Sequence, residues 1–231
     1  MSAELFLYAL LLPLIFWATY HYYHDRHRPE PVVNLLATLG LGVLASLIAG
    51  MGYAGLGLVG LRFDAYLLAE TSPLGLLVYA VLGIGLVEEL AKMLPFLLVV
   101  LRFRDFDDPF DGIVYASFLA LGFAMAENYR YADHLSLSEA VARGFAGPVV
   151  HMVFASLWGH HIGTAVLTGA PVLPVAFRWL AITALVHGAY DVIVIAFSAS
   201  ALFLASALIV VIWFWRLRLV WRLGGGHRSS R

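Results

Sequence analysis

The chain of 231 residues lacks cysteine and has few charged residues. Without cysteine it can form no disulfide, and it has no thiolate to act as a nucleophile or as a metal ligand. Aspartate, glutamate, lysine and arginine make up 13% of the residues, against about a quarter in a soluble domain, while hydrophobic residues make up 62%. That leaves too little polar surface to cover a soluble domain, so the composition predicts an integral membrane protein in a lipid bilayer. The net charge of -1 indicates that nucleic acid is not a partner.

Long apolar segments follow one another along the chain, with short polar breaks between them. A helix needs about 20 mostly apolar residues to cross a bilayer. We therefore expect an all-α transmembrane bundle of about seven spanning helices, with one domain over residues 1–222 and a disordered tail over residues 223–231. The predicted helices are Leu5–Tyr22, Val32–Leu61, Pro73–Leu101, Phe110–Tyr129, Phe145–Leu167, Val172–Phe197 and Leu202–Trp221.

The two sets of loops differ in their arginine content. If the N-terminus is outside, ten arginines fall on the inner side and three, Arg62, Arg130 and Arg143, fall on the outer side. Because basic residues concentrate in cytoplasmic loops, this bias predicts an outside N-terminus and an inside C-terminus. The first apolar segment carries Glu4 where a signal peptide has basic residues, so we interpret it as a retained helix. We expect a multi-pass protein of a bacterial or archaeal cytoplasmic membrane.

Several ionisable residues lie inside these apolar segments, where they are costly and usually mark a function. They are Glu88, Glu89 and Lys92 in the third segment, Glu127 in the fourth, His151 in the fifth, and His187 and Asp191 in the sixth. At about 1.5 Å of helix rise per residue, the acids and these histidines fall between the midplane and the outer boundary of the membrane. Four helices would thus supply polar groups to one buried site. His160 and His161 lie nearer the inner side, and we interpret them as structural.

The spacing of these residues indicates which of them can interact. Lys92 follows Glu89 by three positions and Glu88 by four, so it can reach either carboxylate. Such a pair alone would be a salt bridge that neutralises both charges and holds helices together without taking part in chemistry. His187 and Asp191 are four apart, so the aspartate can fix the imidazole tautomer or act as a ligand beside it. The convergence of histidines and carboxylates at one depth favours a functional site over a purely structural one.

Two hydrolytic mechanisms fit this set of side chains. In the first, histidines and a carboxylate hold a divalent ion such as zinc, and Glu88 or Glu89 is the general base on water. In the second, a desolvated glutamate activates water without metal, while histidines stabilise the oxyanion. The chain contains neither HExxH nor GxSxG, which argues against the standard zincin and serine-hydrolase arrangements.

Four intramembrane motifs resemble those of the PrsW family of intramembrane proteases, and they occur in the family's order. "EELAK" (Glu88–Lys92) resembles the EExxK motif, and "FAMAEN" (Phe123–Asn128) resembles the FxxxEN element. "HMVFASLWG" (His151–Gly159) and "HGAYD" (His187–Asp191) resemble the two histidine-bearing helices. "DRHRPEP" (Asp25–Pro31) is similar to the acidic, proline-rich segment after the family's first helix.

The resemblance implies a polytopic protease that cuts a single-pass membrane protein, such as an anti-sigma factor, on its outer side. The family is grouped with the metallopeptidases and is related to the CAAX-processing and bacteriocin-immunity membrane proteases. By match to its motifs, the catalytic or metal-binding residues are Glu88, Glu89, Glu127, His151 and His187, with Asp191 supporting them. The expected ligands of the metal, with zinc favoured, are His151 and His187 with Glu127 or Asp191. Lys92 and Asn128 match positions with a structural or orienting role.

Two other classes of function use the same kinds of residue. A proton-coupled transporter could use the acids and histidines as a relay, but transporters usually show repeats and matched broken helices, and the sequence has neither pattern. A non-catalytic scaffold or immunity-type protein would bind other membrane helices, and only an assay separates it from a protease. For a protease, a spanning substrate helix has no free backbone groups to attack. We therefore expect the substrate to be cut where its helix frays, near the outer surface.

Overall fold

The computed structural model of the chain describes residues 2–24, 29–197, 207 and 209–218, and its regular elements are all helices. In chain order they are α1 (Ala3–Phe6), η1 (Leu7–Leu11), α2 (Leu12–His24), α3 (Val32–Leu58), α4 (Ala65–Thr71), α5 (Pro73–Val78), η2 (Tyr79–Gly85), α6 (Leu86–Leu98), η3 (Val100–Arg102), α7 (Pro109–Tyr131), η4 (Ala132–His134), α8 (Leu137–Leu167) and α9 (Val172–Ala196). The described residues contain no strand, which confirms the predicted all-α class. The predicted tail, residues 223–231, lies outside them.

Six helical segments of the described chain are long and apolar enough to cross a membrane. They are Glu4–Tyr23, Val32–Leu58, Pro73–Arg102, Pro109–Tyr131, Leu137–Leu167 and Val172–Ala196. Each overlaps one of the first six predicted spans. The seventh predicted span, Leu202–Trp221, is described only in part, and its residues 209–218 are helical. The chain is therefore a multi-pass membrane protein with about the expected number of spans.

The fifth span begins earlier than the sequence predicts, at Leu137 instead of Phe145. Ser136 caps this helix: its hydroxyl accepts a hydrogen bond from the Glu139 amide, and the Glu139 carboxylate accepts one from the Ser136 amide at 2.9 Å. Such a capping box satisfies amides that would otherwise be unpaired at a helix start. The predicted start at Phe145 was wrong because local capping, and not hydropathy, sets the beginning of α8.

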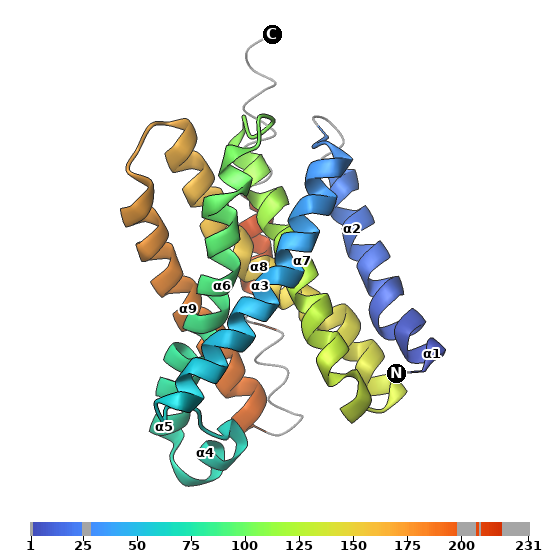
Figure 1. Cartoon of the computed structure of the whole chain (residues 1–231), viewed down its shortest axis with the longest axis vertical. Coiled ribbons are helices and arrows are strands. Elements are labelled where there is room, and N and C mark those ends of the chain that lie inside the picture. Colours follow the sequence, from blue (N-terminus) through green and yellow to red (C-terminus); the bar gives the residue numbers. More distant parts are fainter. Residues whose placement is uncertain (1, 25–28, 198–206, 208, 219–231) are drawn as a thin grey trace.

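Helix α7 lies at the centre of the bundle, packed between α3 and α8 (Figure 1). Figure 1 shows α1 and α2 on one side of this centre, α6 and α9 on the other, and α3 crossing in front. The short helices α4 and α5 and the connection between α7 and α8 lie at the same end of the bundle, on opposite sides of it. Since the charge pattern predicts an outside N-terminus, this end is the predicted outer one.

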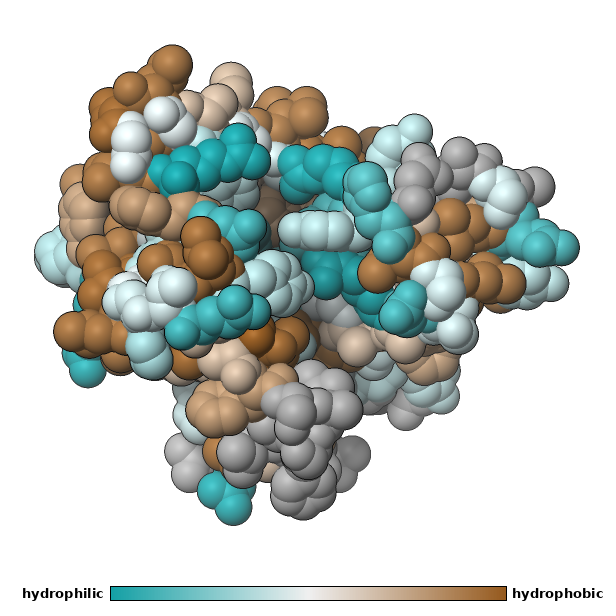
Figure 2. Space-filling model, turned by 90° about the horizontal axis from the view of Figure 1, so that it is seen from below, coloured by the Kyte–Doolittle hydropathy of each residue, from teal (hydrophilic) through white to brown (hydrophobic). Residues whose placement is uncertain are grey.

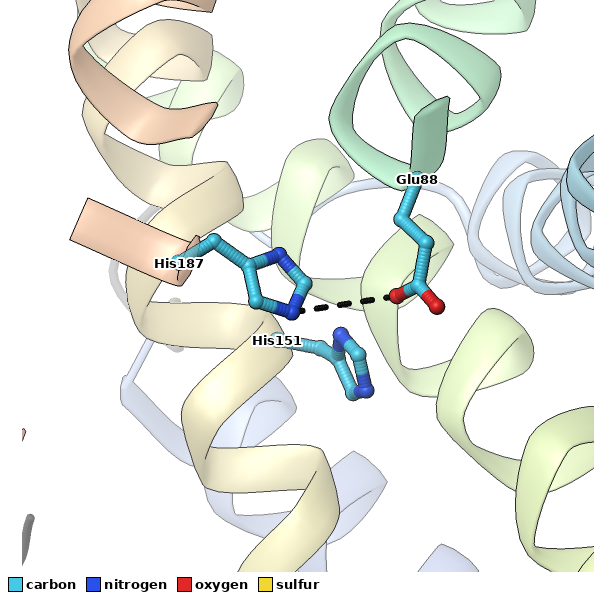
Figure 3. A group of neighbouring side chains, drawn as sticks. All are labelled: Glu88, His151 and His187. Carbon is cyan, nitrogen blue, oxygen red and sulfur yellow. Dashed lines mark ion pairs between the residues drawn. The ribbon is translucent and has the colours of Figure 1, made fainter. Parts of the chain in front are cut away.

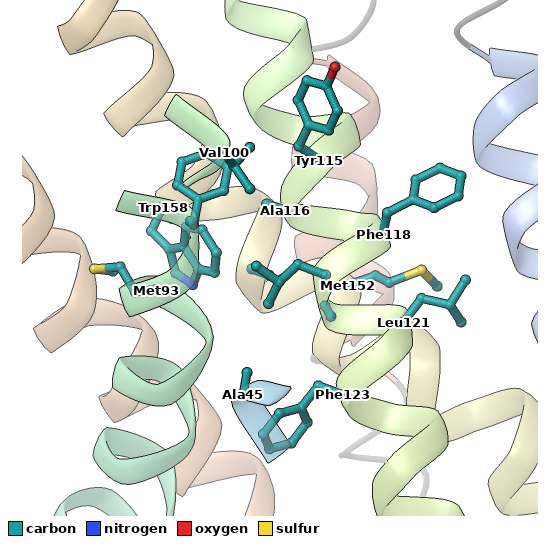
Figure 4. Close-up of a cluster of buried hydrophobic side chains, with 14 of the residues drawn as sticks. Ala45, Met93, Val100, Tyr115, Ala116, Phe118, Leu121, Phe123, Met152 and Trp158 are labelled. Atoms are coloured by element: carbon teal, nitrogen blue, oxygen red, sulfur yellow. The ribbon is translucent and has the colours of Figure 1, made fainter. Parts of the chain in front are cut away.

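The crossing of α3 and α7 is close enough to require glycine. A Cβ atom at Gly42 would lie 2.0 Å from the Leu119 carbonyl oxygen, and one at Gly122 would lie 2.0 Å from the Leu39 carbonyl oxygen. Small residues at such crossings let helix backbones approach each other in lipid. Large buried side chains such as Phe123 fill the space around the crossing (Figure 4). This packing fixes the helix that carries Glu127 against its neighbours.

Candidate active site

Glu89 is fully buried and links three helices. Its Oε1 accepts hydrogen bonds from Lys92 Nζ at 2.5 Å and from His187 Nδ1 at 2.9 Å. Its Oε2 accepts one from the indole of Trp158 at 2.9 Å. Of the two carboxylates within predicted reach of Lys92, Glu89 is thus the one it contacts. With both oxygens engaged, Glu89 ties α6 to α8 and α9 and has no free oxygen to act on water.

The backbone around the two glutamates brings α6 and α9 together. Glu88 and Glu89 stand in the first turn of α6, directly after the π-helical segment η2, and such segments often occur at functional sites. A Cβ atom at Gly188 would lie 2.6 Å from the backbone of Val81. Because α9 can approach η2 this closely, the neighbouring His187 lies beside both glutamates.

Glu88, His151 and His187 each offer a ligand atom within 4.8 Å of the others (Figure 3). All three side chains are buried, and they come from α6, α8 and α9. Because a carboxylate only accepts, His187 donates its Nδ1 hydrogen to Glu89, and in the neutral imidazole Nε2 then has a lone pair. His187 Nε2 lies 3.8 Å from Glu88 Oε2, the contact dashed in Figure 3, which is an ion pair when the imidazole is protonated. Glu88 Oε2 is buried and has no hydrogen-bond partner among the described residues.

His151 has hydrogen bonds at both ring nitrogens. Lys92 Nζ lies 3.2 Å from Nδ1, and Glu127 Oε2 lies 2.9 Å from Nε2. Because an ammonium only donates, Nδ1 accepts and Nε2 carries the hydrogen that Glu127 accepts. To bind an ion, His151 would exchange one of these hydrogen bonds for the ion. Its ring centroid lies 5.5 Å from that of His187, so the two imidazoles are neighbours in the same part of the core.

Glu127 is held by His151 and by an arginine near the start of α8. Its other oxygen, Oε1, accepts from Arg143 Nη2 at 2.9 Å, and the arginine lies over the ring of Tyr131, 4.3 Å from the ring centroid. The side chains of Arg143 and Glu127 are 38% and 13% exposed, so this pair forms the more open edge of the group. Glu127 therefore contacts one of the two predicted metal-binding histidines but is itself already held on both oxygens.

Asp191 and Asn128 lie at the margin of the group. Asp191 Oδ2 is 3.8 Å from His187 Nε2, too far for the hydrogen bond that the sequence suggested, and Glu89 fixes the imidazole tautomer instead. Asp191 Oδ2 is buried and has no hydrogen-bond partner among the described residues. Asn128 is also buried and faces α8, where a Cβ at Gly147 would lie 3.4 Å from its Oδ1.

Three residues of the group were not among the site residues that the sequence predicted: Tyr53, Trp158 and Arg143. Tyr53 of α3 donates to Glu88 Oε1 at 2.8 Å, while Trp158 and Arg143 hold Glu89 and Glu127. Trp158 follows His151 by seven positions, two helical turns, so its side of the helix could have been inferred. No sequence pattern predicts the contacts of Tyr53 and Arg143, because these contacts depend on how separate helices are rotated relative to one another.

The end of the bundle formed by α4, α5 and the α7–α8 connection carries polar side chains. Figure 2 looks at this end and shows hydrophilic side chains gathered around a recess in its middle, with more hydrophobic surface on either side. The surface along the sides of α3 and α9 is rich in exposed apolar residues, among them Leu36, Leu47 and Phe177. Such a distribution suits a bundle whose flanks face lipid and whose ends face water.

Comparison with known proteins identifies one family, whose model matches most of the chain. The family model described as PrsW family intramembrane metalloprotease matches residues 30–217. The protein named Protease PrsW of Clostridioides difficile (strain 630) is 28% identical over 221 residues, which cover 92% of this chain and 88% of that protein. Protease PrsW of Bacillus subtilis (strain 168) is 26% identical over 209 residues, which cover 88% of this chain and 89% of that protein. No solved structure matches the chain.

Proposed function

The chain belongs to the PrsW family of intramembrane metalloproteases, and we propose on this premise that it hydrolyses a peptide bond of a single-pass membrane protein at a metal site formed by Glu88, His151 and His187. Its spanning helices make it a multi-pass protein of the cell membrane, surrounded by the lipid bilayer. One observation carries the choice of site: Glu88 Oε2, buried and without a hydrogen bond among the described residues, lies 3.8 Å from His187 Nε2.

The three side chains fit a divalent ion by their chemistry. Two histidines and one glutamate are a common ligand set of catalytic zinc. His187 also donates its second ring nitrogen to a carboxylate, Glu89, as metal-binding histidines almost always do. An ion held there would supply Lewis-acid polarisation of water or of the peptide carbonyl. Zinc is the ion we favour, because imidazole and carboxylate suit it.

Asp191 is the residue we assign to proton transfer. Its Oδ2 lies 3.8 Å from His187 Nε2 and has no hydrogen-bond partner among the described residues, whereas both oxygens of Glu127 are engaged. As water bonds to the carbonyl carbon, Asp191 accepts its proton. Asp191 then gives that proton to the leaving amide nitrogen while the C–N bond breaks. Glu89 and Glu127 act as positioning residues, the first for His187 and the second for His151.

The family and the predicted depth of the site support the substrate class that we propose. A spanning helix has no free backbone groups, so the bond that is cut must lie where the substrate helix has frayed. The polar recess in Figure 2 lies at the predicted outer end, and we infer that water enters from that side. We therefore assign as substrate a single-pass protein, such as an anti-sigma factor, that is cut near the outer face.

Cleavage of a single-pass test substrate by purified variants tests this assignment. Glu88→Gln and His187→Ala should lose both bound zinc and hydrolysis, because each removes a ligand. Asp191→Asn should keep zinc but lose hydrolysis. Glu70→Gln, a change of an exposed glutamate on α4, is the matched control and should behave as the wild type.

Three outcomes would contradict parts of the proposal. Full hydrolysis by Glu88→Gln or His187→Ala would show that the site is elsewhere. Hydrolysis by Asp191→Asn would remove Asp191 as the proton acceptor and leave Glu127 to be tested next. A folded wild type that cuts no membrane substrate would favour the non-catalytic scaffold.

A further inference from the structure

Tyr53 of α3 holds the oxygen of Glu88 that is not paired with His187. Its hydroxyl donates to Glu88 Oε1 at 2.8 Å, and this is the single hydrogen bond of the Glu88 side chain within the described part of the chain. A phenol has one hydrogen to donate, and a carboxylate only accepts. The two oxygens of Glu88 therefore differ: Oε1 is bonded, and Oε2 faces His187 Nε2 without a hydrogen bond.

The packing of α3 on α6 explains how Tyr53 reaches Glu88. Gly52 precedes Tyr53, and a Cβ atom at Gly52 would lie 2.8 Å from Val87 Cγ1. Val87 directly precedes Glu88 in α6. Because a glycine faces Val87, the two helices can approach closely, and the side chains that follow, Tyr53 and Glu88, meet.

We propose that Tyr53 is a positioning residue of the hydrolytic site, whose hydroxyl fixes the Glu88 carboxylate so that Oε2 points toward His187. The inference rests on the proposed function, in which Glu88 is a ligand. A glutamate side chain has three rotatable bonds, and its terminal torsion is broad, so an unheld carboxylate would rotate and offer either oxygen. Hydrogen bonds from neighbouring residues to ligating side chains set their orientation, and loss of one typically costs 10–100-fold in metal affinity or activity.

Nothing else among the described residues duplicates this contact. His187 Nε2, at 3.8 Å from Glu88 Oε2, is beyond hydrogen-bond distance. Lys92 is bonded to Glu89 and His151 instead. The orientation of Glu88 thus depends on a residue from α3, a helix that carries none of the four intramembrane motifs.

The test compares Tyr53→Phe with the wild type in zinc affinity, kcat, KM and thermal unfolding. The substitution keeps the ring and removes only the hydroxyl, so the fold should persist. Zinc affinity, measured by competition with a chromophoric chelator, should fall about 10–100-fold, and kcat for a single-pass test substrate should fall by a similar factor. KM should stay close to the wild-type value. Tyr66→Phe, at a tyrosine of α4 that is 72% exposed, is the matched control and should change nothing.

The outcomes separate this inference from the proposed function. If the wild type binds zinc and Tyr53→Phe keeps its zinc affinity, the positioning role is overturned, whatever happens to kcat. If the wild type is active but binds no zinc, the metal site of the proposed function fails, and kcat alone decides the inference. In that case a fall in kcat at an unchanged unfolding temperature supports Tyr53 as a positioning residue of Glu88, and an unchanged kcat overturns it.

Discussion

Glu88 and Glu89 are neighbours in the sequence, but their surroundings lead to different expectations for stability. Glu89→Gln would leave the fully buried charge of Lys92 without its carboxylate partner, and breaking such a pair costs about 3–5 kcal/mol. In the metal-free protein Glu88→Gln should cost much less, because there it changes a single hydrogen bond, the one from Tyr53. Thermal unfolding of the two variants in the same detergent, beside the wild type, measures the difference. Equal losses in both would contradict the distinct roles of these residues.

The sequence predicted most of the residues that meet in the site, because an ionisable residue within an apolar segment stands out. Glu88, His151 and His187 were all expected at one depth, and the structure places them together. The different roles of Glu88, which faces His187, and Glu89, which pairs with Lys92, could not be predicted. Adjacent helical positions differ by about 100°, and the sequence does not say which one faces inward. Tyr53 was missed because an isolated tyrosine in an apolar helix is common and its partner lies on another helix.

At the scale of helices, the crossing of α3 and α7 offers a matched pair of glycines. Gly42→Ala would place a methyl group 2.0 Å from the Leu119 carbonyl oxygen, so α3 and α7 must separate. Gly40→Ala, two residues earlier in α3, meets no atom within 4 Å and should be neutral or stabilising by up to about 1 kcal/mol through helix propensity. We expect Gly42→Ala to unfold at a lower temperature than the wild type and Gly40→Ala not to. Equal stability of the two variants would contradict the close crossing.

The helices were easier to predict than their ends. Hydropathy marks a span because a bilayer needs about 20 apolar residues, and each of the first six predicted spans overlaps a helical segment. The start of α8 was missed because the capping box of Ser136 and Glu139 lies in a polar stretch with no hydropathy signal. The π-helical segment before Glu88 was also not predicted, since a change in helix type leaves the apolar pattern intact.

For the whole molecule, the main prediction concerns the side of the membrane on which the substrate is cut. Ten of thirteen arginines lie on the predicted inner side, and the polar recess lies at the opposite end of the bundle. We expect mass spectrometry to place the cleaved bond of a single-pass substrate near or just above the outer surface. Reporter fusions should place the N-terminus outside. A cut in the cytoplasmic half, or an inside N-terminus, would overturn the topology and the route of water together.

The most direct test of the central claim, that Glu88, His151 and His187 hold a catalytic metal, is metal removal and restoration on one purified sample. Metal content and cleavage of a single-pass substrate are measured before chelation, after chelation and after zinc is added back. We expect about one zinc per chain, loss of cleavage with loss of zinc, and recovery of both on re-addition, with no recovery in His187→Ala. Undiminished cleavage by the metal-free protein would contradict the metal site and favour activation of water by a buried glutamate alone.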